Sequence, residues 1–485
     1  MLAKRTVNTL TLISLAYLFL PFAIFLFGWI KLIIALPLVI AGAWFLWQSS
    51  VSEPKAHIVH GSCFVEICIL VILATWVLIA GVGGFMWQNS WDHSFRNAVF
   101  ADLVTREWPV TNGASTLVYY LGFWLPAALC AKFSDSLTVG YIGQYLYALL
   151  GILLAFRLTV QLIGRVTLGA LAVFILFSGL DIIASFIVSG NLPPFGSHFD
   201  KWNPLALWDS NTTLLFWVYN QAIPAWVGTM LMISNLRKST VALLILCFMS
   251  ISAPFACVGL FPLCIYSLFN NVLSRQGEGV FSKISKMLTP ANIYSVIAVI
   301  PVAAYFAINT QSGAFHLAGT LYGHSPWIFA AMNIALEIAI FLPFIFQQVK
   351  RDKTFYILLF TSTILIFIQM GDSFDFSSRT ELPLNYFITY QVMRYVSNWR
   401  THRPVYRVAF IIVLTATMMA PLSEMWRTAA MCESLPRAYW RVHAYDTIFD
   451  TTVCRDNFVA DNTLPRDTPL GFIFRTPVSR TISNK

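Results

Sequence analysis

Residues 9–28, TLTLISLAYLFLPFAIFLFG, and residues 31–48, KLIIALPLVIAGAWFLWQ, are two apolar runs that follow each other almost directly, and they decide the fold class. Each run is long enough to cross a bilayer as a helix, which takes about 17–25 residues. Similar runs recur along all 485 residues, of which 58% are hydrophobic and 11% charged. Soluble proteins carry about 25% charged residues. The sequence therefore predicts an all-α polytopic membrane protein.

Thirteen apolar segments qualify as candidate transmembrane helices. Pro254 separates two short ones, which indicates a hairpin of short helices. The segments are 9–28, 31–48, 63–86, 139–158, 166–187, 213–233, 240–252, 254–271, 291–308, 327–348, 354–371, 383–398 and 406–423. We predict a transmembrane domain over residues 1–423, with a first large periplasmic loop at 87–138, and a small periplasmic tail at 424–485.

The net charge of +9 comes from basic residues in the short connections between these segments. Such residues mark the cytoplasmic ends of spans, so the charge predicts topology and not a nucleic-acid partner. Lys4 and Arg5 place the N-terminus in the cytoplasm, and later connections on that side carry Arg157, Arg237 and Arg400. The C-terminus is then periplasmic. The short loops favour a multi-pass protein of the bacterial inner membrane.

Residues 116–133, TLVYYLGFWLPAALCAKF, are also apolar enough to span. If they crossed, every later basic connection would lie on the wrong face of the membrane. We therefore expect an interfacial or re-entrant helix there, with Tyr120 and Trp124 at the level of the lipid headgroups. A disulfide between Cys432 and Cys454 is expected in the tail if the tail is extracytoplasmic.

The first large loop opens with WDHSFRN at residues 91–97. Helical spacing places Asp92 and Arg96 one turn apart, and an apolar face is formed by Phe95, Val99 and Leu103. This pattern predicts an amphipathic helix along the membrane surface. Asp92 can act there as a general base, with His93 beside it. The alternative is an ordinary solvated ion pair.

Two further stretches carry polar groups that suit a site. Asp181 lies near the end of a candidate span, where an ionisable group indicates either function or a buried interhelical pair. Charged and aromatic side chains follow in a Pro-rich loop and suit a sugar or a phosphate, or solvent: His198, Asp200, Lys201, Trp202 and Asp209. For His198 and Asp209 the solvated loop is the favoured interpretation. The next apolar run is interrupted by polar groups that line a cavity or bond between helices: Tyr219, Asn220 and Gln221.

The last third of the chain adds Arg379, just outside a span, where it can bind a phosphate or extend toward water. Asp375 close by is an alternative partner for it. His324 faces the same compartment. A divalent metal stays open, because no ligand spacing of a known type is present.

A long span followed by a large loop that begins with an acidic residue resembles the GT-C class of integral membrane glycosyltransferases. The resemblance covers about residues 60–400, and its motifs are Trp91–Arg96, the juxtamembrane stretch Trp108–Lys132, Gly179–Asp181 and Arg379. The chain departs from the class in two ways. Two spans precede the loop where many members have one, and Asp92-His93 stands in place of a pair of carboxylates.

The resemblance implies transfer of a sugar from a polyprenyl-phosphate carrier to an extracytoplasmic glycan or lipid acceptor. Its implied catalytic residues are Asp92, His93 and Asp181. The implied ligands of the donor phosphate are Arg96, Lys201 and Arg379. Substrate contacts are expected from Trp202, Tyr219, Asn220, Gln221 and His324.

Other classes of membrane protein remain as alternatives. A transporter or flippase of lipid-linked glycans needs polar residues along a membrane pathway, and Glu66, Asp181 and Glu337 do not form an obvious one. An O-antigen polymerase or ligase usually has one large late loop, whereas the largest polar loop here is early. A membrane O-acyltransferase is the remaining enzyme alternative.

Overall fold

The computed structural model describes residues 6–52, 59–86, 88, 90–273, 287–309, 314–319, 325–370, 374–434, 446–451, 455–461 and 471–475. This part of the chain is almost entirely helical, and its strands are only two or three residues long. The protein is thus an all-α protein with long apolar helices, as predicted for a membrane-embedded chain.

Within the described ranges, six helical segments are long and apolar enough to cross a bilayer. They are α1 (Thr9–Trp29), α2 (Leu32–Ser50), α6 (Leu137–Ile163), α7 (Leu168–Leu176) with α8 (Asp181–Ser189), the segment from α14 (Pro326–Asn333) to α15 (Leu342–Val349), and α19 (Pro404–Thr417) with α20 (Met419–Ser434). The other helices of the bundle are α3 (Cys63–Ile79), α9 (Asn211–Ser234), α10 (Ser239–Met249), α11 (Pro254–Leu273), α13 (Pro290–Phe306), α16 (Lys353–Leu365) and α18 (Leu382–Ser397). Each predicted span falls on one of these helices.

Two predicted spans are interrupted. The span predicted at 63–86 ends at Ile79, because the glycines that follow have positive φ angles of 77°, 84° and 69° at Gly81, Gly83 and Gly84. The span predicted at 166–187 breaks between α7 and α8. There Gly179 lies against Glu337, and an added Cβ would stand 1.2 Å from the Glu337 Oε2. The helical segment is thus interrupted where the chain packs against Glu337.

The segment at 116–133 contains β4 (Ser115–Leu117), a short 3₁₀ turn and α5 (Leu125–Ser134). A helix of this length rises about 15 Å, half of the hydrocarbon thickness. The prediction for Trp124 is wrong. Its side chain is fully buried and its Nε1 donates to the Tyr219 hydroxyl at 3.4 Å, so it packs inside the protein and not at a headgroup.

The first loop and the tail pack together. The apolar face of α4 (Ser90–Thr105) is buried, as its spacing predicted. β3 (Thr111–Asn112), β4 and β7 (Val459–Ala460) form a small antiparallel sheet, and Asp102 accepts from the Thr447 hydroxyl at 2.8 Å and from the Ile448 N–H at 2.8 Å. Residues 447–448 and 459–460 of the tail therefore cover α4 and β4, while residues 473–475 bond to the connection between α1 and α2.

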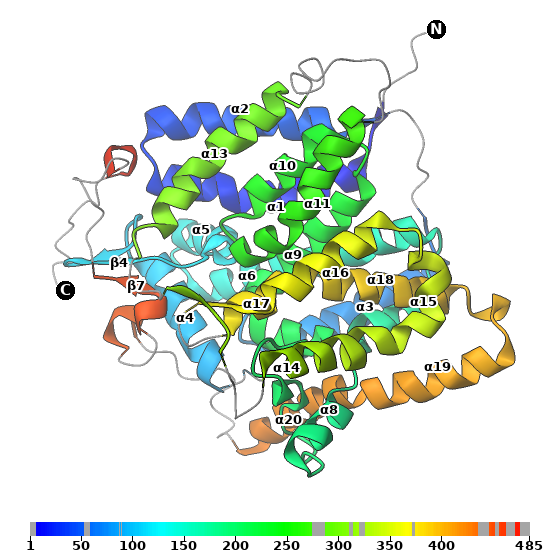
Figure 1. Cartoon of the computed structure of the whole chain (residues 1–485). Helices are drawn as coiled ribbons and strands as arrows, with labels where there is room; N and C mark the ends of the chain where they lie inside the picture. Colours follow the sequence, from blue (N-terminus) through cyan, green and yellow to red (C-terminus); the bar gives the residue numbers. More distant parts are fainter. Residues whose placement is uncertain are drawn as a thin grey trace, which may run out of the picture.

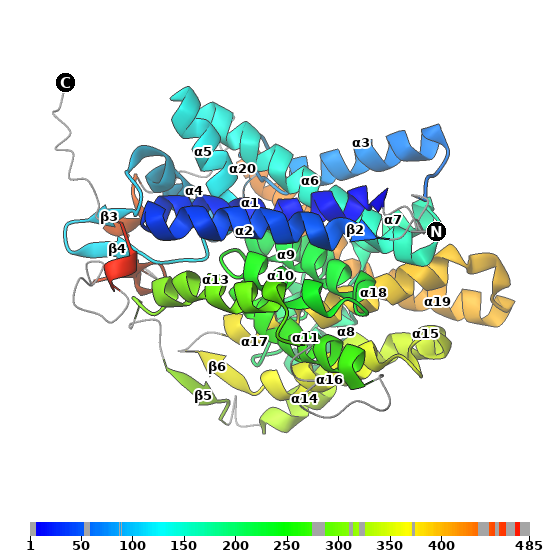
Figure 2. The ribbon, with the colours of Figure 1, turned by 90° about the horizontal axis from the view of Figure 1, so that it is seen from above.

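The elements that carry polar side chains gather at one end of the bundle. Figures 1 and 2 both place α4 and β4 at one end, with α15 and the start of α19 at the opposite end. α17 (Asp375–Thr380) lies between the two ends, nearer to α4 (Figures 1 and 2), and the 3₁₀ turn Phe199–Trp202 follows α8 in the chain. Smaller strand pairs are β1 (Thr6–Val7) with β2 (Val51–Ser52) and β5 (Phe315–Leu317) with β6 (Ile368–Met370).

Candidate active site

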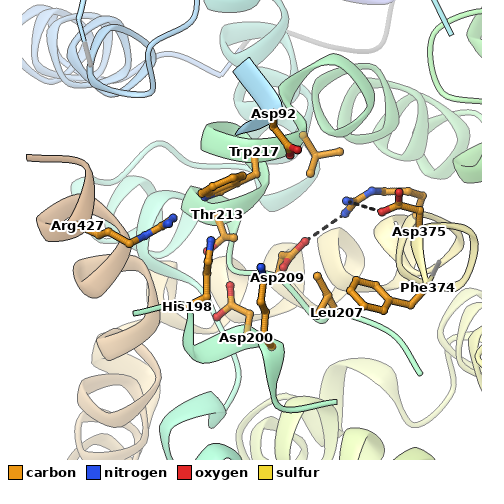
Figure 3. A pocket seen from close by; sticks show the side chains of 13 residues that line it. Asp92, His198, Asp200, Leu207, Asp209, Thr213, Trp217, Phe374, Asp375 and Arg427 are labelled. Carbon is orange, nitrogen blue, oxygen red and sulfur yellow. Dashed lines mark hydrogen bonds and ion pairs between the residues drawn. The ribbon is translucent and has the colours of Figure 1, made fainter. Parts of the chain in front are cut away.

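A cavity of about 360 Å³ opens between α4, α9, α17 and α20. It brings together charged side chains from segments that are far apart in the sequence, as Figure 3 shows. Its lining residues are Asp92, His198, Asp200, Lys201, Leu207, Asp209, Thr213, Trp217, Val218, Phe374, Asp375, Arg379 and Arg427. Three of the sequence-predicted site residues are among them: Asp92, Lys201 and Arg379.

Asp92 enters the cavity from the first turn of α4 (Figure 3). Its side chain is 36% exposed, and Arg96 Nη2 donates to Asp92 Oδ2 at 3.3 Å. Arg96 itself does not line the cavity. Its side chain is 8% exposed, and its guanidinium carbon lies 5.3 Å from the centre of the Tyr219 ring. Arg96 thus orients Asp92, and the prediction that it faces a donor phosphate is not borne out by its position.

Arg379 forms ion pairs with two carboxylates that line the cavity. Arg379 Nη1 donates to Asp209 Oδ2 at 3.1 Å, and Nη2 donates to Asp375 Oδ1 at 3.3 Å. The Asp209 side chain is 4% exposed and the Asp375 side chain 49%. Burial raises the pKa of Asp209, and the charge of Arg379 opposes that rise. The Arg379–Asp209 pair is therefore a buried structural pair, whereas the Asp375 contact is open to exchange.

Lys201 and Asp200 come from the 3₁₀ turn after α8. Lys201 is exposed to the cavity, and it has no carboxylate partner in the described part of the chain. Asp200 is buried, and burial together with Asp181 and Asp209 raises its pKa well above the usual range. Lys201 is left as a cation that can accept a ligand anion.

The far wall of the cavity contains a group that sequence reasoning did not assign to a site. Arg427 and Glu424 of α20 form an ion pair, and the Arg427 guanidinium lies 4.6 Å from the centre of the Trp217 ring. His198 Nδ1 lies 3.4 Å from Glu424 Oε2. Burial, with the charges of Arg427 and Lys201, lowers the pKa of His198 to about 3. The low pKa favours a neutral His198 beside Glu424.

A sequence signal for this group existed. Glu424 and Arg427 are three residues apart in a segment that continues an apolar helix, which is typical of a paired helix face. The domain boundary expected at residue 424 falls within α20 and separates these residues from the cavity that Arg427 lines.

Several predicted site residues lie away from the cavity. His93 is fully buried, and its Nε2 lies 2.9 Å from the Phe216 carbonyl of α9. Asp181 is 1% exposed, accepts from Ser178 Oγ at 2.6 Å and accepts from Trp202 Nε1 at 3.3 Å. His93, Asp181 and Trp202 thus connect helices, and none of them lines the cavity. A direct catalytic role for His93 and Asp181 and a substrate contact for Trp202 are not supported by this geometry.

The polar triplet of α9 is also buried. Tyr219 is 2% exposed and lies under Arg96, while Asn220 and Gln221 are 0% and 2% exposed. None of the three lines the cavity, which α9 meets through Thr213, Trp217 and Val218. Among the described residues, both side-chain polar atoms of Asn220 and Oε1 of Gln221 are buried without a hydrogen-bond partner, so neither a substrate contact nor a bond between helices is seen for them.

Three predictions cannot be placed. His324, Cys454 and the side chain of Cys432 lie outside the described residues. The described residues offer no group of three or more His, Cys, Asp or Glu side chains that could hold a metal ion. Arg379 lies between Asp209 and Asp375, so these carboxylates already have a cationic partner. The described part of the cavity therefore does not fit a divalent metal, and no step through one is derived.

The comparisons with known proteins add no family to this geometry. No protein-family model matches the chain, no curated protein matches its sequence, and no solved structure matches its fold. The side chains of the cavity and their chemistry are therefore what indicates a function.

Proposed function

We propose that the chain is a membrane glycosyltransferase of the GT-C type, which transfers a sugar from a polyprenyl-phosphate carrier to an extracytoplasmic glycan or lipid acceptor. The observation that carries the proposal is the meeting of Asp92, Lys201 and Arg379 at one cavity. An accessible carboxylate shares that cavity with two cations. The reaction needs a base at the acceptor hydroxyl and positive charge at the leaving phosphate.

Asp92 would take the proton of the acceptor hydroxyl. The acceptor oxygen bonds to the anomeric carbon as the bond from that carbon to the phosphate oxygen breaks, and the phosphate leaves with the electron pair. The Asp92 side chain is 36% exposed and is oriented by Arg96, so an acceptor hydroxyl can reach it while the contact with Arg96 is kept. A base on the acceptor favours inversion at the anomeric carbon.

Lys201 and Arg379 would stabilise the leaving phosphate. Lys201 has no carboxylate partner in the described part of the chain, so binding an anion costs it no existing pair. Arg379 keeps its buried pair with Asp209, and its second nitrogen can exchange the half-exposed Asp375 for a phosphate oxygen.

The proposal includes thirteen transmembrane helices, a cytoplasmic N-terminus and a bacterial inner membrane. The arrangement of the helices supports this orientation. α4 and β4 lie toward one end of the bundle, while the basic connections at 350–352 and 399–403 join helices at the other (Figures 1 and 2). Basic connections on one side are typical of a cytoplasmic face.

One observation favours a second candidate, membrane O-acyl transfer. His198 and Glu424 form a histidine–carboxylate pair at the cavity, which is the usual arrangement for a base that activates a hydroxyl. A His198 pKa of about 3 makes this imidazole a weak base at neutral pH, so glycosyl transfer by Asp92 is the better supported reaction.

The test uses purified full-length protein with a panel of polyprenyl-phosphate sugars and a crude glycan acceptor, and it measures release of polyprenyl phosphate. We expect Asp92→Asn to lower release at least about 100-fold, the usual contribution of a general base. The matched control is Asp135→Asn, since Asp135 is an exposed carboxylate of the same loop that does not line the cavity. Equal release by Asp92→Asn and wild type would refute the proposed role, and acyl transfer lost in His198→Gln would favour the second candidate.

A further inference from the structure

A second cavity lies at the end of the bundle opposite to α4. It is a groove of about 650 Å³ between α15, the end of α18 and the start of α19. Its lining residues are Ala339, Leu342, Pro343, Phe344, Phe346, Gln347, Tyr395, Thr401, His402, Arg403 and Tyr406. One of them is a cation and none is acidic, in contrast to the cavity at Asp92, where carboxylates and cations are mixed.

One wall of the groove is apolar and exposed. It is formed by α15, on which Phe346 is 51% exposed, with Leu342, Pro343 and Phe344 beside it. Tyr406 of α19 is 48% exposed on the facing side. Exposed side chains of this kind on a membrane helix face hydrocarbon chains, so the groove is continuous with the lipid.

The other end of the groove is polar and cationic. Arg403 is exposed, has no carboxylate partner in the ranges that the structure describes, and stands at the N-cap of α19. The first backbone N–H groups of a helix have no partner within it and favour an anion. Arg403 and this helix end therefore present positive charge to the groove.

A buried hydroxyl supports a ligand at this end. Tyr395 lines the groove and is 2% exposed, yet its hydroxyl has no hydrogen-bond partner among the residues that the structure describes. The Tyr395 ring is held in place by His402, which stacks on it at 3.8 Å and whose Nε2 lies 3.0 Å from the Tyr395 carbonyl. A buried hydroxyl without a partner is costly, and a bound polar group would remove that cost.

We propose that this groove binds one anionic phospholipid. Its phosphate would contact Arg403 and accept from the Tyr395 hydroxyl, and an acyl chain would cover Phe346. The occupant follows from the side chains: the polar end is cationic without any acid, which selects an anion, and the apolar wall selects hydrocarbon. A basic pocket between membrane helices is the usual form of an anionic headgroup site. This proposal is independent of the reaction at Asp92.

The test is native mass spectrometry of the full-length protein in detergent, titrated with dioleoyl phosphatidylglycerol or dioleoyl phosphatidylcholine. We expect one phosphatidylglycerol to bind more tightly than phosphatidylcholine. Arg403→Gln should weaken that binding about fivefold, the effect of one basic residue near an anionic lipid. The matched control is Arg400→Gln, because Arg400 is an exposed neighbour in the same connection that does not line the groove.

Tyr395→Phe is the second variant, since it removes only the hydroxyl and keeps the ring that stacks on His402. It should weaken phosphatidylglycerol about fivefold and leave phosphatidylcholine unchanged. Equal losses in Arg403→Gln and Arg400→Gln, or no preference for phosphatidylglycerol, would overturn the proposal. Displacement of the lipid by millimolar inorganic phosphate would also overturn it, because the site would then recognise the free anion.

Discussion

The pair of Arg379 and Asp209 offers the sharpest test of the cavity's electrostatics. Both side chains are less than one tenth exposed, and the nitrogen and oxygen lie 3.1 Å apart. Arg379→Gln leaves the Asp209 carboxylate buried without its cation. Breaking a buried pair in this way costs about 3–5 kcal/mol of unfolding free energy. The half-exposed contact to Asp375 adds little, because exposed pairs contribute about 0–1 kcal/mol.

The cost should depend on pH. Burial already raises the pKa of Asp209, and loss of Arg379 removes the charge that opposes this rise. In the variant, the Asp209 carboxyl of the folded state therefore holds a proton at pH values where the unfolded state has released it. The penalty of Arg379→Gln is therefore largest at pH 8 and shrinks as the pH falls toward 4, where the unfolded carboxyl also takes up its proton.

The assay is equilibrium unfolding in mixed detergent micelles at pH 8 and pH 5, with Asp375→Asn as the matched control. We expect Arg379→Gln to be more destabilising than Asp375→Asn, and the double variant with Asp209→Asn to recover part of the loss. Additive losses in the double variant, or a penalty for Arg379→Gln that is the same at both pH values, would show that the pair is not the buried interaction described.

Three further predictions concern other parts of the fold. Asp102→Ala removes the acceptor of Thr447 Oγ1 and should free the segment that starts there, at a cost of about 2–4 kcal/mol; faster hydrogen exchange confined to that segment checks it. His198→Gln should reduce the loss of stability on acidification. The pKa of His198 is about 3 in the folded protein, so at pH 5 the imidazole takes up a proton only in the unfolded chain, which lowers the free energy of unfolding by about 2 kcal/mol. Unfolding at pH 7 and pH 5 measures this, and an unchanged difference between the two pH values contradicts it. Gly259→Ala places a Cβ 2.1 Å from the Thr380 carbonyl and should cost about 1–3 kcal/mol by moving α17; a thermal midpoint equal to that of wild type would contradict it.

Much of the candidate site was within reach of sequence reasoning. The spacing of Asp92 and Arg96 predicted their pairing, since residues four apart on a helix are neighbours. His93 was predicted to share the site, and the structure places it away from the cavity for a simple reason. Successive residues on a helix point about 100° apart, so once Asp92 faces the cavity His93 faces α9.

Asp181 and Asp209 show more clearly what the sequence could not predict. Asp181 was singled out and Asp209 was regarded as a solvated loop residue, yet Asp209 lines the cavity and Asp181 is buried beside Trp202. The break at Gly179 turns the chain between α7 and α8, and it exists because Glu337 of a distant segment packs there. No local pattern predicts where such a crossing will occur.

The sequence by itself determined the class of the molecule and the positions of its helices, because apolar length and basic connections are local properties that a bilayer selects. The tertiary structure alone decided which charges meet. Within the described ranges Lys201 has no carboxylate partner while Arg379 binds Asp209, and Arg427 comes from the segment assigned to the tail. The electrostatics of a cavity depend on distances between residues far apart in the chain, and only packing sets those distances.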